Sequence, residues 1–312
     1  MPYACPICAY SPVITKVSKV EGIWPRDHTV LYCSSCSSYF LEDMPTEAEL
    51  QSYYRAQYYQ SSVGKAKDSI KHLFREFRTA NQASFIMQSI RSPTPLKILE
   101  IGAGDGRLLW KVRPLAEGRF EKLHGLELSP YYVDYAQKKW GLKLQDQDFF
   151  SLTGPYDLIL MSHVFEHFVD LAKVVDHLRR LLSPGGYLFV EVPHSPSPKE
   201  VSPQDLAHFL NTTHTYNFTA PSIRAFWERA GYQVLAAQRS TYHLPRFVDA
   251  ATRTQVAKVF LEGRGLGWKT AWYALVYLLG HTFAPETSYT TIPWDSPYWG
   301  PGDNVRLMLK IG

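Results

Sequence analysis

The sequence predicts an α/β fold built on a doubly wound, largely parallel sheet. Between Leu96 and Val192, short apolar runs alternate with amphipathic segments. The first run, "LKILEI", leads directly into the glycine-rich turn "GAGDG", and the second run ends in an acid, Glu127. That acid follows the turn by about 20 residues, the spacing at which a carboxylate can reach the ribose of a bound nucleoside. Alternation of this kind places a ligand at the carboxyl ends of the strands.

The composition is that of a globular protein with one large domain and a smaller unit. The chain has 312 residues, 45% of them hydrophobic and 20% charged. The formal charge of +4 is too small to indicate a polyanionic partner, so nucleic acid is not expected. The amino terminus lacks the pattern of a signal peptide, and no apolar run approaches the roughly 20 residues that span a bilayer. We therefore expect a cytoplasmic monomer or homodimer without a membrane span.

All four cysteines lie near the amino terminus, in two C-x-x-C pairs: Cys5 with Cys8, and Cys33 with Cys36. Two such pairs complete a tetrahedral zinc site of four thiolates, and free thiols persist in a reducing compartment. Strand-like sequence between the pairs predicts a zinc ribbon over residues 1–43. Its zinc is structural, because four cysteine ligands leave no open coordination position.

Residues 44–95 are predicted to form a helical linker or cap. Thr46 and Glu49 form a capping box that opens a short helix. Apolar residues then follow helical spacing from Ser69 to Ile90, and two prolines close the region.

Strands are expected in order at 96–101, 123–129, 142–148, 156–162 and 186–193, with helices after the first, second and fourth. Two further strands, 231–240 and 304–311, complete the sheet. The core domain is predicted to span 96–244, followed by an insertion at 245–303 and the last strand within 304–312. The insertion contains an apolar helix near Trp272 and a loop with Trp294, Tyr298 and Trp299. These aromatic residues fit an acceptor cover, a dimer contact or a packed tail.

The segment "ILEIGAGDG", with an acid at Glu100, resembles the first motif of the class I S-adenosylmethionine-dependent methyltransferases. "LQDQDFF" is similar to their third motif, with Asp148 preferred over Asp146 as the acid that addresses adenine. The segment from Tyr156 to Pro193 is similar to the fourth and fifth motifs of the small-molecule branch. The ribbon and "YYRAQYY" resemble a subgroup found among sugar and natural-product enzymes. The resemblance implies a Rossmann-like seven-stranded methyltransferase sheet with S-adenosyl-L-methionine held by Glu100, Gly102, Ala103, Gly104, Gly106, Glu127, Leu128, Asp148, Phe149 and Ser162.

The stretch "SHVFEH" contains the letters of an inverted zinc-protease motif, H-x-x-E-H. We reject a protease, because His163 lies at the end of the fourth strand, and a protease would need a third ligand far downstream and a cleft scaffold that nothing else in the chain favours. Three interpretations of His163, Glu166 and His167 remain. They can hydrogen-bond backbone as scaffold, a histidine can act as general base, or the three can bind a divalent metal with His214 or His208. The metal interpretation rests on a similar E-x-x-E-H box that is a metal site in quinone and small-RNA methyltransferases.

We prefer the base, because an imidazole with a pKa near 6.5 can accept a proton at neutral pH. His163 also replaces the first acid of the metal box, which disfavours a hard ion such as Mg²⁺. His214 and Tyr216 match a histidine and an aromatic residue on the loop after the fifth strand in the resembling family. They are candidate catalytic residues or packing for the next helix.

The expected function is methyl transfer to a small-molecule acceptor by in-line displacement. Oxygen is slightly preferred as the methylated atom over carbon, with nitrogen also open. Metal-assisted O-methylation is a further alternative. From other classes, an RNA methyltransferase and a non-catalytic binding module of the same fold remain alternatives; near-balanced charge speaks against the first, and the intact glycine loop and Glu127 against the second.

Overall fold

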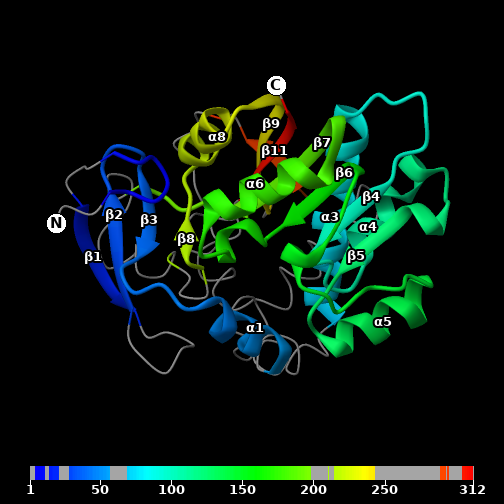
Figure 1. The fold of residues 1–312 in the computed structure, drawn as a ribbon, viewed down its shortest axis with the longest axis horizontal. Helices are drawn as coiled ribbons and strands as arrows, with labels where there is room; N and C mark the ends of the chain where they lie inside the picture. Colours follow the sequence, from blue (N-terminus) through cyan, green and yellow to red (C-terminus); the bar gives the residue numbers. More distant parts are fainter. Residues whose placement is uncertain are drawn as a thin grey trace, which may run out of the picture.

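The computed structural model describes residues 4–10, 14–20, 28–56, 69–197, 210, 214–242, 289–292, 294 and 304–311 (Figure 1). His208, the predicted apolar helix near Trp272, Tyr298 and Trp299 lie outside these residues. The helices are α1 (Glu47–Ala56), α3 (Ser69–Ser89), α4 (Arg107–Val112), α5 (Pro130–Trp140), α6 (Leu171–Leu181) and α8 (Ala220–Arg229). The strands of the main sheet are β4 (Ile98–Ile101), β5 (Leu123–Leu126), β6 (Tyr156–Ser162), β7 (Leu182–Pro193), β9 (Tyr232–Tyr242), β10 (Tyr289–Ile292) and β11 (Asn304–Ile311).

The main sheet has the strand order β10-β9-β11-β7-β6-β4-β5. Strands β5, β4, β6 and β7 are parallel, and β11 runs antiparallel to both β7 and β9. The chain moves outward from β4 to β5 and then returns to the other side of β4 with β6. The carboxyl ends of β4 and β6 therefore flank a crevice of the kind that binds ligands in doubly wound folds.

Helices cover both faces of this sheet, and alternate residues of its strands pack against different helices. Leu99, Ile101 and Ile159 belong to a buried cluster with residues of α6 and α8. Their neighbours Ile98 and Leu158 belong to a second cluster with residues of α3, α4 and α5. Burial on both faces explains why β4 and β6 read as continuous apolar runs.

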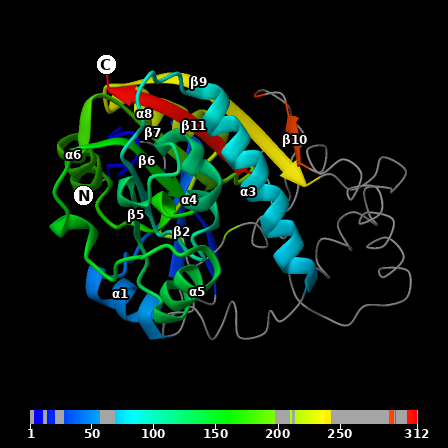
Figure 2. The same cartoon turned by 90° about the vertical axis from the view of Figure 1, so that its right-hand side faces the viewer.

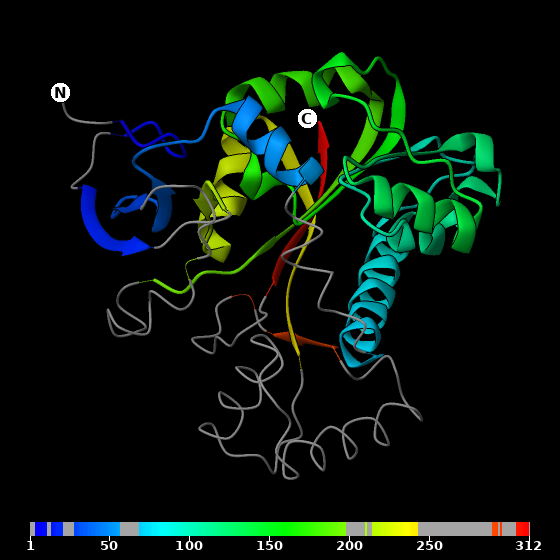
Figure 3. The same cartoon turned by 90° about the horizontal axis from the view of Figure 1, so that it is seen from below.

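The expected third strand, 142–148, is not formed. Only an isolated bridge joins Gln145 to Leu126, and the side chains from Gln145 to Asp148 are exposed. Leu142 and Leu144 are buried against the core, but the segment is polar from Gln145 onward and its backbone bonds to β5 only around Gln145, so it runs along β5 without extending the sheet. The edge strand β10 instead joins at the opposite end, pairing with β9 from within the predicted insertion (Figure 3).

A second sheet contains β1 (Ile14–Val20), β2 (His28–Cys33), β3 (Ser38–Leu41) and β8 (Tyr216–Asn217). The amino-terminal unit supplies the first three strands, and the segment after β7 supplies the fourth. Figure 1 shows this unit beside β8 and α8, so the amino-terminal unit packs directly on the core.

Residues 44–95, the predicted linker or cap, form helices α1 and α3. Thr46 and Glu49 make the expected reciprocal hydrogen bonds at the start of α1. The long helix α3 crosses beside α4 (Figure 2). No helix among the described residues is long and apolar enough to cross a membrane.

Candidate active site

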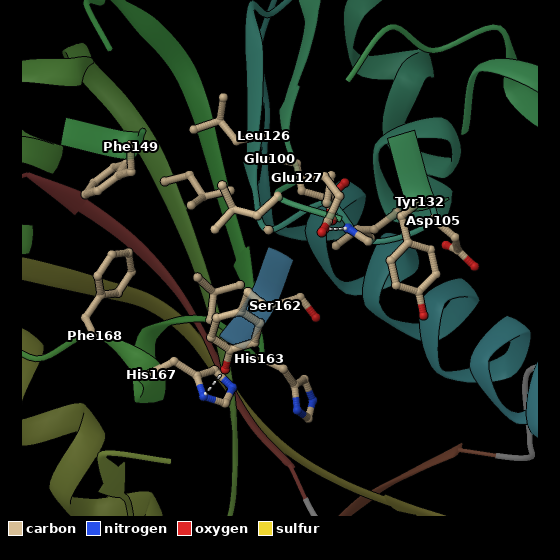
Figure 4. Close-up of a pocket in the computed structure, with 18 of the residues that line it drawn as sticks. Glu100, Asp105, Leu126, Glu127, Tyr132, Phe149, Ser162, His163, His167 and Phe168 are labelled. Atoms are coloured by element: carbon tan, nitrogen blue, oxygen red, sulfur yellow. Dashed lines mark hydrogen bonds between the residues drawn. The ribbon is translucent and has the colours of Figure 1, made fainter. Parts of the chain in front are cut away.

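A cavity of about 340 Å³ lies at the carboxyl ends of β4, β5 and β6, and α1 and α3 contribute to its wall. This volume is in the range of small-molecule sites. Figure 4 shows Glu100 and Glu127 in one part of the cavity and His163 and His167 in another. One cavity therefore combines the glycine turn with the two histidines of "SHVFEH".

The glycine turn and Glu127 form one unit. Gly102 and Gly104 have φ angles of +65° and +53°, a region that side chains with a Cβ rarely adopt. A Cβ on Gly102 would lie 2.5 Å from Val164, whereas a Cβ on Gly104 would meet open space. The Glu127 carboxylate accepts hydrogen bonds from Gly104 N at 2.7 Å and Ser129 N at 2.8 Å. The acid is thus fixed at the cavity wall by the backbone of the turn.

Nine of the ten predicted cofactor residues line the cavity, and Gly106 does not. Gly106 instead caps the start of α4, with a φ of +75°. Asp148 lines the cavity, but Asp146 does not and pairs with Arg55 of α1. Burial raises the pKa of Glu100 well above its ordinary value, and its carboxylate accepts a hydrogen bond from Leu109 N.

The loop after β6 carries the "SHVFEH" residues. We expected a helix to follow this fourth strand, and α6 does so, but it begins only at Leu171. Phe165–His167 instead forms a single turn of 3₁₀ helix. His163 has a φ of +56°, which is uncommon for a residue with a Cβ, and its backbone N–H donates to Glu191 O. This tight exit from the strand directs His163 and His167 to the cavity, which both side chains line.

His163 lies between charged groups that can serve both of its protonation states. Its Nε2 atom is 3.3 Å from Glu191 Oε1 and 3.3 Å from Arg78 Nη1. A neutral imidazole can accept from the guanidinium, and a protonated one can donate to the carboxylate. Burial lowers the pKa of His163, an effect that Arg78 strengthens and Glu191 opposes. The imidazole is thus favoured in its neutral, proton-accepting form.

Glu166, His167 and His214 form a compact cluster beside the cavity. Glu166 Oε1 is 3.8 Å from His167 Nε2 and 4.0 Å from His214 Nε2. The two imidazole rings have centroids 4.7 Å apart. Burial raises the pKa of Glu166 to about 8 and lowers that of His214 well below its ordinary value. Burial therefore favours the neutral forms of Glu166 and His214.

Of the other two candidates, Tyr216 does not line the cavity. Its hydroxyl donates to Val169 O at 2.6 Å, and burial raises its pKa. His214 does not line the cavity either, but it meets His167 behind the wall. The structure thus brings His214 to the histidine cluster and ties Tyr216 to backbone.

Sequence reasoning did not assign Tyr54, Arg75, Arg78 and Gln82 to the site, although all four line the cavity. Tyr54 Oη lies 2.8 Å from His167 Nδ1. Gln82 Nε2 donates to Ser162 Oγ and to Glu191 Oε1. For Arg75, Arg78 and Gln82, the available signal was that they are polar positions in the predicted helix at 69–90, whose apolar positions already account for its packing.

The four cysteines converge at the edge of the amino-terminal sheet. All are free thiols, and their sulfur atoms lie within 4.8 Å of one another. Cys5 Sγ is 3.7 Å from Cys36 Sγ, and Cys8 Sγ is 3.7 Å from Cys33 Sγ. Sulfurs bound to one zinc ion at about 2.3 Å are roughly 3.8 Å apart, so the spacing suits a tetrahedral thiolate site.

Part of the chain is similar in sequence to curated synthases. Over 120 residues it is 28% identical to the hybrid PKS-NRPS synthetase lepA of Aspergillus flavus, covering 35% of this chain and 3% of that protein. Over 164 residues it is 27% identical to the non-reducing polyketide synthase ausA of Penicillium brasilianum, covering 48% and 6%. The chain thus spans a small fraction of these relatives.

Among solved structures, it is similar to a SAM-dependent methyltransferase, possible histamine N-methyltransferase, from Thermotoga maritima. That match has 14% identity and a TM-score of 0.45 and covers 81% of this chain and 98% of that one. The family model described as a methyltransferase domain matches residues 70–237, more than half of the chain. The chain belongs to this methyltransferase family.

Proposed function

We propose that the protein transfers a methyl group from S-adenosyl-L-methionine to an oxygen atom of a small-molecule acceptor, with His163 as the general base. The observation that carries this proposal is the shared cavity, which is lined by the glycine turn, by Glu127 and by the partly exposed His163 imidazole. S-adenosylmethionine is the cofactor of this methyltransferase fold. The acceptor, the methylated atom and the base are the parts we add.

The residues of the cavity suit the cofactor. Glu127 is held by two backbone N–H groups and keeps lone pairs for the ribose hydroxyls. Gly104 leaves open space where a side chain would stand, and Phe149 and Asp148 lie on the wall where the adenine would contact them. When bound, the cofactor would supply an electrophilic methyl group for the acceptor oxygen, with S-adenosylhomocysteine as the other product. His163 accepts the proton of the acceptor hydroxyl, and Glu191 then faces the imidazolium.

The size of the site and the relatives favour a small acceptor. After the cofactor positions are assigned, the remaining wall includes Tyr54, Phe168, Arg75 and Arg78. This mixture of aromatic and cationic side chains suits a hydroxylated ring with polar substituents. The similarity to polyketide synthases supports a polyketide as the acceptor class, with a sugar as the alternative.

Calorimetry with S-adenosylhomocysteine tests the cofactor. We expect one binding event per chain and at least 10-fold weaker binding by Glu127→Ala. Asp146→Ala is the matched control, because it removes a nearby acid that does not line the cavity, and its affinity should equal that of wild type. No detectable binding, or undiminished binding by Glu127→Ala, would refute the cofactor assignment.

Turnover is tested by release of S-adenosylhomocysteine from a panel of phenols, hydroxylated polyketides and sugars. O-methylated product identified by mass spectrometry would support the proposal. Carbon- or nitrogen-methylated product would correct the acceptor atom. Cofactor binding without turnover on any acceptor would favour a binding module, and salt-sensitive retention on RNA would favour an RNA substrate.

For the four cysteines, we propose a structural Zn²⁺. The observation that supports it is the 3.7 Å spacing of the sulfur pairs in a largely buried cluster. Elemental analysis should find one zinc ion per chain that is lost in Cys5→Ser. Wild-type protein purified without zinc and with the same thermal stability would contradict this assignment.

A further inference from the structure

Helix α3 presents a row of polar side chains to the cavity. Arg75, Arg78, Thr79 and Gln82 all line it, and their spacing of three and four residues places them on one face of the helix. Gln82 anchors this face, because its Nε2 atom donates a hydrogen bond to Ser162 Oγ at 2.8 Å. The arginine one turn before Gln82 is therefore held beside the carboxyl end of β6.

Arg78 extends to the proposed base. Its Nη1 atom lies 3.3 Å from His163 Nε2, and the His163 side chain is 24% exposed. An acceptor hydroxyl that donates to Nε2 would therefore stand within reach of the guanidinium. When hydrogen bonds to the two nitrogen atoms run side by side, the two acceptor oxygens are separated by about the same 3.3 Å. A hydroxyl and a carboxylate on neighbouring carbon atoms match this spacing.

The charges around His163 favour an anionic group on the acceptor. Besides burial, Arg78 and Arg306 lower the pKa of His163, and Glu191 opposes them. Burial raises the pKa of Glu166 to about 8, so this carboxyl is favoured as neutral. Two guanidiniums thus act on the imidazole against one ionised carboxylate. Because Arg306 already pairs with Glu191 at 2.7 Å, Arg78 is the cation of this group that lines the cavity.

The cofactor has a carboxylate of its own, so the place of Arg78 along the cavity matters. Figure 4 shows His163 in a different part of the cavity from Glu127, which marks the cofactor side. Arg75, one turn before Arg78, extends to the cofactor side instead, because its Nη1 atom donates to Tyr132 Oη at 3.3 Å. The carboxylate within reach of Arg78 is therefore that of the acceptor.

We propose that Arg78 binds a carboxylate of the acceptor that neighbours the methylated hydroxyl. The substrate class is then a hydroxy acid whose hydroxyl and carboxylate stand on neighbouring ring or chain carbons. This inference rests on the proposed function and names the class of its acceptor. Guanidinium–carboxylate hydrogen bonds are roughly twice as strong as neutral ones and fix orientation. Arg78 thus determines specificity by placing the hydroxyl at His163, which keeps its role as the base.

Three small probes separate charge from spacing in protein saturated with S-adenosylhomocysteine. Salicylate has a carboxylate beside its hydroxyl, 4-hydroxybenzoate has the same charge at the wrong spacing, and 2-hydroxyacetophenone has the spacing without the charge. Calorimetry should find salicylate bound at least about 10-fold more tightly than either other probe. Arg78→Gln should remove this preference but keep the affinity for 2-hydroxyacetophenone within about 2-fold, because an amide can still donate to a ketone.

Arg119→Gln is the matched control. It removes an arginine charge that is 53% exposed and does not line the cavity, so the preference for salicylate should stay as in wild type. Arg78→Lys provides a second variant in case Arg78→Gln does not fold, and it should lose part of the preference because lysine lacks the planar fork of donors. Equal affinity of wild type for the three probes, or an unchanged preference in the Arg78 variants, would overturn the proposal.

Binding of S-adenosylhomocysteine to each protein is measured first, which keeps the two proposals separate. Wild type that binds it but does not prefer salicylate refutes only the carboxylate contact, whereas wild type that does not bind it refutes the proposed function. A loss of S-adenosylhomocysteine affinity in Arg78→Gln as large as the loss for salicylate would assign Arg78 to the cofactor and overturn this inference.

Discussion

Two buried carboxylates near the carboxyl ends of neighbouring strands differ in what surrounds them. Glu191, in β7, is 0% exposed and lies 2.7 Å from Arg306 Nε on the adjacent strand β11. Burial alone would raise the pKa of Glu191, but Arg306, together with His163 and Arg78, lowers it to about 2. Glu166, after β6, is also buried, but no arginine or lysine of the described residues forms an ion pair with it; burial raises its pKa to about 8, and Arg78 only partly opposes this rise.

Glu191 is thus ion-paired with an arginine, whereas Glu166 faces only imidazoles within about 4 Å among the described ionisable groups. The Glu191–Arg306 pair supplies its own counter-ion and is part of the scaffold that orients His163. Glu166 has imidazoles where Glu191 has a guanidinium, and a neutral imidazole cannot neutralise a carboxylate. The same residue type is therefore ion-paired in one place and favoured as a neutral carboxyl a short distance away.

The largest effect should come from breaking the completed pair. Arg306→Met leaves Glu191 buried without its cation, which should cost about 3–5 kcal/mol of unfolding free energy, measured by urea denaturation. The double variant Arg306→Met/Glu191→Leu should recover part of this loss. Glu166→Gln, with a neutral group replacing a carboxyl that is already favoured as neutral, should cost less than about 1 kcal/mol. Equal losses for Arg306→Met and Glu166→Gln would end the distinction.

The pH dependence of Glu191 follows from its lowered pKa. The folded state binds the proton less tightly than the unfolded state, so the carboxylate contributes stability above the ordinary pKa of 4.5 and loses it as the pH falls toward about 2. The full contribution is about 3 kcal/mol. The stability gap between wild type and Glu191→Gln should therefore shrink between pH 5 and pH 3, measured by denaturant unfolding at each pH. A constant gap would show that Glu191 is not the titrating group.

Much of the fold could be predicted because its signals are local. The glycine turn, the apolar runs of β4 and β6 and the capping box of α1 each depend on a few adjacent residues. The segment at 142–148 was wrongly predicted as a strand: Leu142 and Leu144 alternate and are buried as in a strand, but only one bridge, at Gln145, joins the segment to β5. The pairing of β3 with β8 joins residues far apart in the chain, so no local pattern could indicate it.

Only part of the candidate site could likewise be predicted from the sequence. The glycines and Glu127 follow motif spacing, and the structure brings them together. The pairing of Tyr54 with His167 depends on where α1 docks, and the pairing of Glu191 with Arg306 depends on the register of β7 and β11. His163 and Glu166 could be named as functional candidates, but their different neighbours required the tertiary structure.

His163 lies between the two carboxylates and tests which of them governs its chemistry. His163→Ala should reduce turnover by about 100-fold while the affinity for S-adenosylhomocysteine stays near that of wild type. Turnover is measured on whichever acceptor the panel identifies, and added imidazole should restore part of it. His124→Ala should have no effect on turnover. If His163→Ala retains full activity, the base lies elsewhere and His163 only bridges the scaffold.

A smaller effect than that of Arg306→Met is expected where the segment before β8 joins the amino-terminal sheet to the loop that carries Glu166. Thr215 is 1% exposed, and its hydroxyl lies 2.8 Å from Glu166 O and 2.7 Å from Phe168 O. Its own carbonyl accepts from Leu41 N, next to the β3–β8 pairing. Thr215→Val removes this tie and should cost about 1–2 kcal/mol of stability, whereas Thr215→Ser should keep it.

The informative measurement is the ring ¹⁵N signals of His167 and His214, which depend on tautomer and hydrogen bonding. Thr215→Val should shift these signals because the loop that carries Glu166 loses an anchor, and Thr215→Ser should not. Tyr39→Phe is the matched control: it removes another buried hydrogen bond from β3, to Pro196 O, and should leave both rings unchanged. If Tyr39→Phe shifts the two rings as much as Thr215→Val, the amino-terminal unit affects the cluster through general stability. If only Thr215→Val shifts them, the Thr215 side chain is the link between the amino-terminal sheet and the loop that carries Glu166.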